Sequence, residues 1–271
     1  MPELPEVETT RRGIENSVTG QTITALIVRD RRLRWPIKSG LESELAGQRI
    51  TGVGRRAKYL LIYCERGALI LHLGMSGSLR VLPPATPVSK HDHFDLLLDS
   101  GACLRFIDPR RFGSLHWTNG DPVNHELLRS VGPEPLEASF DARYLYRVSR
   151  RRTVTLKNFL MNGRVVVGVG NIYASESLFR ARLRPGRRAS SLSLRDAGRL
   201  ARAVKAVLRG AIRAGGTTLR DYVGADGTPG YFRQKLYVYE RNGQPCRICR
   251  TKIRRATHGQ RSTYYCPDCQ K

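Results

Sequence analysis

The chain begins Met1-Pro2-Glu3-Leu4-Pro5-Glu6-Val7-Glu8, and this stretch predicts the start of a helix that carries chemistry. Removal of Met1 would leave Pro2 with a secondary α-amine, a nucleophile whose pKa near ~8 lies far below that of lysine. Pro5 suits the first turn of a helix, where Glu6 and Glu8 complement the positive helix end. That end disfavours a protonated Pro2, and Glu3 can move protons for it. An ordinary acidic helix entrance is the alternative.

Short apolar runs follow this helix, which we expect Gly20 to end. Turn residues separate the runs, so they read as strands rather than helices. Eight strands are expected, near residues 23–28, 49–53, 58–64, 68–73, 78–81, 94–98, 103–107 and 113–117. Short strands at this spacing are typical of an antiparallel sandwich or a flattened barrel. Pro133 and Pro135 then mark a domain boundary.

The pattern after Phe140 is helical. Glycines in 165–170 lead into Asn171, a good N-cap, and such a turn exposes N–H groups that can seat a phosphate; a tight turn without a ligand is the alternative. Residues 194–212 predict a long amphipathic helix with a capping-box start at Ser193 and Asp196. Residues 217–231 are rich in Gly, Thr and Asp and predict a long loop with a functional role.

The charge of the chain points to a polyanion. Lys and Arg number 47 against 23 Asp and Glu, a net charge of +24, and the isoelectric point is about 10.6. Each phosphate that a cation neutralises releases a counterion, which favours nucleic acid. A merely basic, ribosomal-type surface is one alternative. An anionic membrane is another, but no basic amphipathic helix with a large apolar face stands out. With no long apolar stretch and no signal-like N-terminus, we expect a cytoplasmic protein that contacts no membrane.

Four of the six cysteines form the most specific motif in the chain. Cys246-x2-Cys249 is followed, after sixteen residues, by Cys266-x2-Cys269. This spacing predicts one structural zinc ion, and because the segment is too short to build its own core, the metal should be needed for folding. Two disulfides are the alternative, which an intracellular location disfavours.

Arg261 lies between the two cysteine pairs, where we expect the tip of a β-hairpin. A guanidinium there can bind a phosphate through two hydrogen bonds, or it can be one more solvated cation.

Further motifs recur along the chain: Arg56-Ala57-Lys58-Tyr59-Leu60, His72-Leu73-Gly74-Met75-Ser76-Gly77, Lys90-His91-Asp92-His93, Asp108-Pro109-Arg110-Arg111-Phe112-Gly113 and Gly168-Val169-Gly170-Asn171-Ile172-Tyr173-Ala174-Ser175-Glu176. With the first six residues and the cysteine motif, they give a chain that closely resembles the bacterial formamidopyrimidine-DNA glycosylases from end to end.

The resemblance implies an α+β fold in three domains. Residues 1–134 would form an antiparallel β-sandwich with the catalytic N-terminal helix. Residues 135–230 would form a helix-two-turn-helix DNA-binding domain, including a loop at 217–231 that closes over the extruded base. Residues 231–271 would form the four-cysteine zinc-finger β-hairpin. A monomer acting on duplex DNA in the bacterial cytoplasm, associated with the nucleoid, is the implied setting.

The resemblance also implies base-excision repair by a bifunctional enzyme, a DNA glycosylase and abasic-site lyase. Its substrates would be duplex DNA with oxidised purines (8-oxoguanine and formamidopyrimidines) or abasic sites. The Pro2 amine would attack C1′, expel the base and form an iminium, after which β- and δ-elimination cut the strand. Glu3 and Lys58 would transfer protons, Arg261 would hold the phosphate of the extruded nucleotide, and Glu6 would support them.

Three side chains of the family fill the gap that an extruded base leaves, and they correspond here to Met75, Arg110 and Phe112. Without the resemblance, Met75 and Phe112 would be interpreted as core residues. The family's contacts to the DNA backbone correspond to His72, His91, Arg110, Arg152 and Asn171, and Lys157 also lies near the expected groove.

Two other functions compete with this one. The sister enzyme for oxidised pyrimidines usually has Gly where this chain has Leu4, and it lacks the Asp108-Pro109-Arg110-Arg111-Phe112 motif. A non-catalytic DNA-binding module would explain the charge and the cysteines but would not need Pro2 or Glu3.

Overall fold

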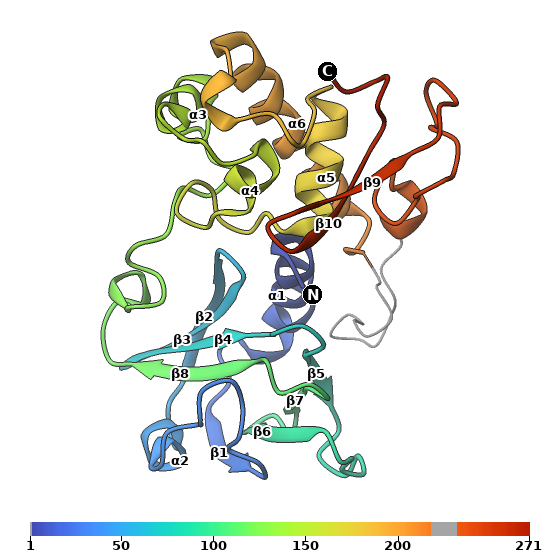
Figure 1. Cartoon of the computed structure of the whole chain (residues 1–271). Helices are drawn as coiled ribbons and strands as arrows, with labels where there is room; N and C mark the ends of the chain where they lie inside the picture. Colours follow the sequence, from blue (N-terminus) through green and yellow to red (C-terminus); the bar gives the residue numbers. More distant parts are fainter. Residues whose placement is uncertain (1, 218–231) are drawn as a thin grey trace. The chain divides into compact units, whose positions relative to one another are not determined.

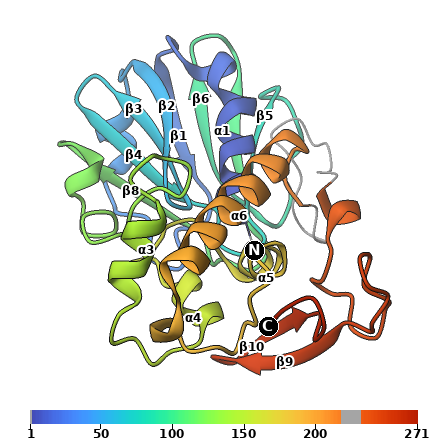
Figure 2. The same cartoon turned by 90° about the horizontal axis from the view of Figure 1, so that it is seen from above.

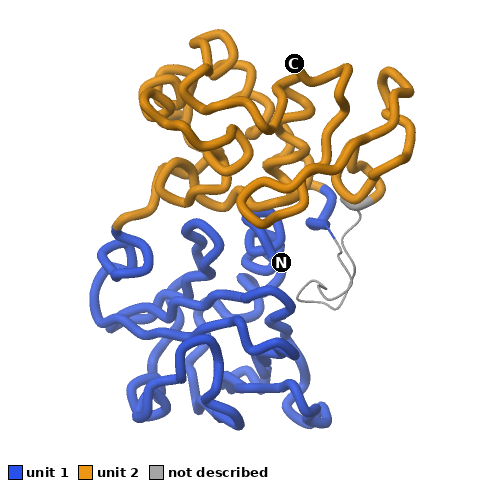
Figure 3. Tube along the Cα trace, in the orientation of Figure 1, with its two compact units in different colours: residues 1–129, 214–231 blue, residues 130–213, 232–271 orange. Residues whose placement is uncertain are grey.

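The computed structural model describes residues 2–217 and 232–271 (Figure 1). The chain divides into two compact units (Figure 3). The first joins Met1–Arg129 to Ala214–Tyr231, and the second joins Ser130–Arg213 to Phe232–Lys271. Each unit therefore contains two segments that lie far apart in the sequence. Met1 and most of the loop expected at 217–231 lie outside the described residues.

The first unit is built on two four-stranded antiparallel sheets, with the strand orders β1-β6-β7-β5 and β2-β3-β4-β8. The strands are β1 (Ile23–Val28), β2 (Ile50–Arg56), β3 (Tyr59–Cys64), β4 (Gly67–His72), β5 (Ser78–Leu82), β6 (Asp92–Leu98), β7 (Cys103–Ile107) and β8 (Ser114–Thr118). Two have the predicted bounds, and the others differ at their ends by up to three residues. The antiparallel sandwich is confirmed.

Alternation along the strands decides which side chains fill the core. Leu60 and Ile62 of β3 join the main hydrophobic core of this unit. Leu61, between them, packs with Ile70 and Leu128 instead. Because successive side chains of a strand point to opposite faces, this sheet is covered on both sides.

Helix α1 (Leu4–Val18) lies against strands β2, β3 and β5 of the same unit (Figure 2). Its apolar face places Val7, Ile14 and Val18 in the main core, as the helical period requires. The sandwich thus fixes the helix that begins directly after Pro2 and Glu3. A second helix, α2 (Leu41–Leu45), was not predicted because five residues are too few to show a period. A short 3-10 turn, η1 (Pro122–Asn124), completes the unit.

The second unit combines helices with a β-hairpin. Its elements are α3 (Ala142–Ser149), α4 (Leu156–Met161), α5 (Asn171–Arg180), η2 (Ala189–Ser191), α6 (Leu194–Arg213), η3 (Phe232–Lys235), β9 (Arg254–His258) and β10 (Arg261–Tyr265). Helix α6 packs against α3 and α5, while α5 also contacts α4 and β10. The predicted helical and zinc-finger parts are both confirmed. No helix in the described part of the chain is long and apolar enough to span a bilayer.

The helix starts in this unit follow the sequence with one exception. The Ser193 hydroxyl accepts the N–H of Asp196 at 3.0 Å, as the capping pattern predicted. Asn171 was predicted to be the N-cap of α5, and this prediction is wrong. Gly170 is the N-cap, and Asn171 is the first helical residue. The Asn171 amide donates instead to the carbonyl of Ser262 at 3.1 Å, so its side chain joins α5 to β10.

Candidate functional site

Pro2 and Glu3 are buried directly before the first turn of α1, where Glu3 is the N-cap. The Glu3 N–H donates to Glu6 Oε2 at 2.8 Å, and Glu6 Oε1 accepts the N–H of Thr217 at 2.8 Å. Glu6 is itself only 2 % exposed. Its carboxylate therefore ties the N-terminus to the segment that follows α6, within the same unit.

Gly216 makes this tie possible. Its φ of +83° lies in the left-handed region, and a Cβ there would come within 3.2 Å of Glu6 Oε1. Glycine meets both demands, because it adopts positive φ readily and leaves room for a close neighbour.

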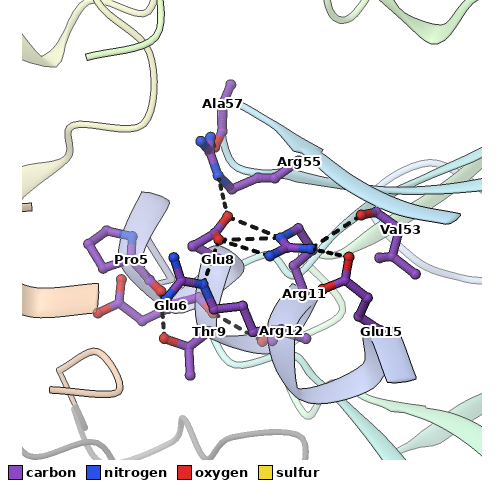
Figure 4. Close-up of polar contacts among 11 residues, drawn as sticks. Pro5, Glu6, Glu8, Thr9, Arg11, Arg12, Glu15, Val53, Arg55 and Ala57 are labelled. Carbon is purple, nitrogen blue, oxygen red and sulfur yellow. Dashed lines mark hydrogen bonds and ion pairs between the residues drawn. The ribbon is translucent and has the colours of Figure 1, made fainter. Parts of the chain in front are cut away.

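A chain of polar contacts joins α1 to the turn that carries Lys58 (Figure 4). Glu8 accepts from Arg12 Nε at 2.8 Å and from Arg55 Nε at 3.3 Å. Arg55 also donates to the carbonyl of Ala57 at 2.9 Å. Ala57 has a φ of +57°, a strained conformation for alanine that this contact helps to hold. Burial alone raises the pKa of Glu8, but hydrogen bonds from Arg11 and Arg12 lower this pKa below its ordinary value. The carboxylate therefore stays charged.

His72 lies at the end of β4 as a neutral base. Burial, together with the nearby charges of Lys58 and Arg34, lowers its pKa to about 4. Its Nδ1 accepts the N–H of Gly74 at 2.9 Å, and its ring packs against Tyr59 at 4.9 Å between centroids. With Nδ1 occupied as an acceptor, a neutral His72 carries its proton on Nε2 and can donate a hydrogen bond there.

Met75, Arg110 and Phe112 come together from two loops. Gly74 has a φ of +68°, and a Cβ there would lie 2.5 Å from backbone atoms of Phe112 and Gly113. The two loops are thus in backbone contact beside Met75. The Arg110 guanidinium stacks over the Phe112 ring at 5.0 Å, and the ring is 42 % exposed.

Asp108 holds these two loops together. It is fully buried, and its Oδ1 accepts the Ser76 hydroxyl at 2.7 Å and the Arg110 N–H at 3.3 Å. Its Oδ2 accepts the Gly113 N–H at 2.8 Å. The Asp108 N–H donates to the carbonyl of His91 at 3.0 Å, which places His91 next to the same loop.

The second unit gathers a different set. Arg261 opens β10 and pairs with His258 of β9, with Gly259 and Gln260 at positive φ in the turn between them. The predicted hairpin tip is confirmed, and the Arg261 side chain is exposed. Asn171 contacts the neighbouring Ser262, so both predicted phosphate-binding residues lie at one end of this unit.

Arg152 and Lys157, the other predicted cations of this unit, differ in exposure. Arg152 is exposed after α3. Lys157 is fully buried; its ammonium donates to the carbonyl of Asn171 at 2.8 Å and to the hydroxyl of Ser175. These two bonds turn the Lys157 side chain into the interior, where it holds the start of α5. Its position near the expected DNA groove stays a prediction.

Four cysteine sulfurs converge at the base of the hairpin. The Sγ atoms of Cys246, Cys249, Cys266 and Cys269 all lie within 4.8 Å of one another. Cys249 and Cys266 approach to 3.4 Å, and Cys246 and Cys269 to 3.9 Å. Tetrahedral zinc with Zn–S bonds near 2.3 Å requires about 3.8 Å between sulfurs, whereas a disulfide requires about 2 Å. The thiols are free, and their arrangement fits a zinc ion.

Sequence reasoning found the outer residues of the site and the supporting Glu6, but it gave no role to Asp108, Ser76 or Arg55. Asp108 and Ser76 lie within motifs used for the resemblance, yet neither was given a role. An Asp that precedes Pro at a turn was the available signal for Asp108, since such a carboxylate commonly accepts nearby backbone N–H groups. Arg55 gave no signal, because its role depends on Glu8 of a distant helix.

Comparison with known proteins agrees with this geometry. The model of the formamidopyrimidine-DNA glycosylase N-terminal domain matches residues 1–115, and the model of the H2TH domain of the same enzyme matches residues 131–223. A zinc finger found in FPG and IleRS matches residues 243–271. A formamidopyrimidine-DNA glycosylase from Thioalkalivibrio sulfidiphilus is 57 % identical over the full length of both chains, and one from Nitrosococcus oceani is 56 % identical.

Solved structures show the same fold. The MutM (FPG) protein of Thermus thermophilus is 42 % identical, with a TM-score of 0.88 over 99 % of this chain and 98 % of that one. A Lactococcus lactis FPG mutant in complex with DNA that contains Fapy-dG is 32 % identical, with a TM-score of 0.93 over the whole of both chains. A further Lactococcus lactis Fpg complex, with DNA that contains an abasic site, has a TM-score of 0.91.

Fold and site together define a DNA-binding repair enzyme with a zinc finger. The chain belongs to the formamidopyrimidine-DNA glycosylase family, as the sequence motifs indicated. The expected enzyme class, a DNA glycosylase with abasic-site lyase activity, follows from this membership.

Proposed function

We propose that this chain removes oxidised purines, namely 8-oxoguanine and formamidopyrimidines, from duplex DNA and then cuts the strand by β- and δ-elimination. The geometry of the first turn of α1 carries the proposal. Buried Glu3 and Glu6 hold the chain so that the nitrogen of Pro2 lies at the positive end of the helix. That end lowers the pKa of an α-amine and keeps it nucleophilic.

In the proposed mechanism, removal of Met1 frees the Pro2 nitrogen, which attacks C1′ of the damaged nucleotide. The C1′–N bond to the base breaks and its electron pair leaves with the base, which takes up a proton. The Pro2 nitrogen then loses its proton and its lone pair expels O4′, which takes up a proton, so that the sugar ring opens and an iminium forms at C1′. The iminium acidifies the C2′ hydrogen, and loss of this proton expels the 3′ phosphate. Loss of the C4′ hydrogen in a second elimination expels the 5′ phosphate. Glu3 and Lys58 transfer the protons, while Arg261 holds the phosphate.

Glu6 and Arg55 act as positioning residues in this scheme. Glu6 fixes the backbone of Glu3 through the 2.8 Å bond to its N–H. Arg55 joins Glu8 of α1 to the carbonyl of Ala57, directly before Lys58. Both contacts support a constant separation between the Pro2 end of α1 and the Lys58 turn.

Met75, Arg110 and Phe112 are proposed to enter the duplex where the base has left it. Exposed Phe112 would wedge between base pairs and Arg110 would contact the unpaired partner base. His72, His91, Arg152 and Asn171 would bind the DNA backbone. One structural zinc ion on the four cysteines would hold the hairpin that carries Arg261. The enzyme would act as a monomer.

Excision assays test the proposal. We expect release of 8-oxoguanine opposite C to exceed release of thymine glycol, and Glu3→Gln to abolish turnover with duplex binding largely kept. Glu15→Gln is the matched control, because Glu15 lies on the outer face of α1 with its side chain 43 % exposed.

Faster release of thymine glycol would favour the oxidised-pyrimidine enzyme instead. Full turnover by the Glu3→Gln variant would favour a role in which this carboxylate moves no proton.

A further inference from the structure

A cleft of about 850 Å³ in the second unit lies apart from the residues proposed for catalysis. Its walls are the C-terminal part of α5, the C-terminal half of α6 and the base of the zinc finger. This volume is in the range of clefts that bind a ligand. A smaller cleft of about 470 Å³ continues it along α6 and shares Arg180, Arg182 and Ala206.

The floor of the cleft is apolar and its rim is cationic. Phe179 and Val207 line it beside Ile248, which is 58 % exposed. Six cations surround this floor, all with exposed side chains: Arg180, Arg182, Arg209, Arg213, Lys235 and Arg247. Within the described residues, none of these six rim cations forms an ion pair, whereas Arg187 and Arg199 pair with Asp196.

Glu176 is the acid that lines the cleft, and its charge is not available to the rim. It is 3 % exposed. Its two oxygens accept the N–H groups of Tyr237, Val238 and Tyr239 at 2.9 Å each. The rim of the cleft therefore presents an excess of positive charge to solvent.

Arg182 occupies a position that favours glycine. It follows the C-cap of α5 with a φ of +56°, a site where helices usually place Gly because a Cβ is strained there. The strain places one more guanidinium at the point where the two clefts meet. Strained residues concentrate at functional sites, so this position supports a binding role for the rim.

The cleft lies far from the end of the unit that carries the proposed phosphate contacts. Asn171 begins α5 and Arg180 ends it, which separates them by about 14 Å along the helix axis. Arg261 lies at the hairpin tip, whereas Ile248 and Cys269 of the cleft lie at the zinc-finger base.

We propose that this cleft binds an acidic, extended peptide segment of a partner protein, with an apolar side chain seated on Phe179, Val207 and Ile248. The cations along α6 that form no ion pair with a described residue extend from Arg202 to Arg213, about 17 Å, which matches roughly five residues of extended chain. A nucleic-acid strand fits less well, because it needs free aromatic faces. One face of Tyr237 is already stacked on Phe179 at 5.4 Å.

The test measures fluorescence anisotropy of a labelled octapeptide of six aspartates and two leucines. The full-length protein carries zinc and is saturated with a 15-base-pair duplex, so that the DNA-binding surface is occupied. We expect binding to persist and to weaken about tenfold in Arg182→Gly/Arg209→Gln, since each lost cation contributes roughly threefold. Arg182→Gly relieves backbone strain, so the variant should fold.

The matched control, Arg143→Gln/Arg195→Gln, removes two exposed cations of α3 and α6 that do not line the cleft. It should bind the peptide like the unmodified protein. The proposal is overturned if the duplex displaces the peptide, if both double variants bind alike, or if an asparagine version of the peptide binds equally well. Tighter binding of an eight-nucleotide thymidine strand with the same dependence on Arg182 and Arg209 would assign the cleft to nucleic acid instead.

Discussion

Arg110 in the first unit and Arg261 in the second are both exposed cations on turns, but different forces hold the two turns. The loop of Arg110 is fixed by the buried carboxylate of Asp108, which accepts two backbone N–H groups and the Ser76 hydroxyl. The loop of Arg261 belongs to a hairpin over a small cluster of five buried residues, two of them cysteines. A large core with internal hydrogen bonds stabilises one turn, whereas the other lies over a small core beside four cysteines whose arrangement fits a zinc ion.

Metal removal should reveal the largest difference between the two units. Chelation, or Cys266→Ser, should unfold the hairpin and abolish DNA cleavage, because a structural zinc contributes on the order of 10 kcal/mol to folding. The only two tryptophans, Trp35 and Trp117, lie in the first unit. Their fluorescence should stay unchanged while far-ultraviolet circular dichroism changes. A tryptophan shift on metal loss would show that the first unit also depends on the finger.

Substitution at Gly74 should damage the loop of Arg110 without affecting the finger. An added Cβ would meet the backbone of Phe112 and Gly113 at 2.5 Å, so Gly74→Ala should destabilise the first unit by roughly 3 kcal/mol. Gly101→Ala is the matched control: its φ is +76°, but nothing lies within 4 Å of the new Cβ. Only strain of about 1 kcal/mol is expected there. Urea titration followed by tryptophan fluorescence compares the two, and equal losses would refute the close contact.

Acid should weaken the first unit through Asp95, with a smaller effect. Burial alone raises its pKa, but hydrogen bonds from Arg29 and Arg105 outweigh burial and lower it to about 2. The folded pKa is below the unfolded value near ~3.9, so this stabilisation is complete above pH ~4 and is lost as pH falls towards ~2. Urea titrations across this window should show a loss of about 2 kcal/mol. A flat profile would mean that Asp95 is not the charged partner of Arg105.

Much of the fold could be predicted because apolar alternation is local. The runs at Ile23–Val28 and Cys103–Ile107 gave strands with the observed bounds. The cysteine cluster and the hairpin tip at Arg261 could also be predicted, because their signals lie within a short stretch of sequence. The division into three domains, with boundaries at residues 134 and 230, stays a prediction. The structure itself divides the chain into two compact units.

The supporting contacts could not be predicted, because they join residues far apart in the chain. Asp108 meets Ser76 across 32 positions, and Glu6 meets Thr217 across 211. The N-cap prediction for Asn171 was wrong because its side chain donates a hydrogen bond to Ser262, 91 residues away. Local patterns contain no information about such partners.

Mass analysis after borohydride reduction tests the central claim most directly. The protein is incubated with duplex DNA that contains 8-oxoguanine, reduced, and digested with trypsin. We expect the sugar remnant on the peptide of residues 2–11, attached to the nitrogen of Pro2, with Met1 absent. Undiminished strand cleavage by protein that retains Met1, or an adduct on a lysine instead, would contradict the account.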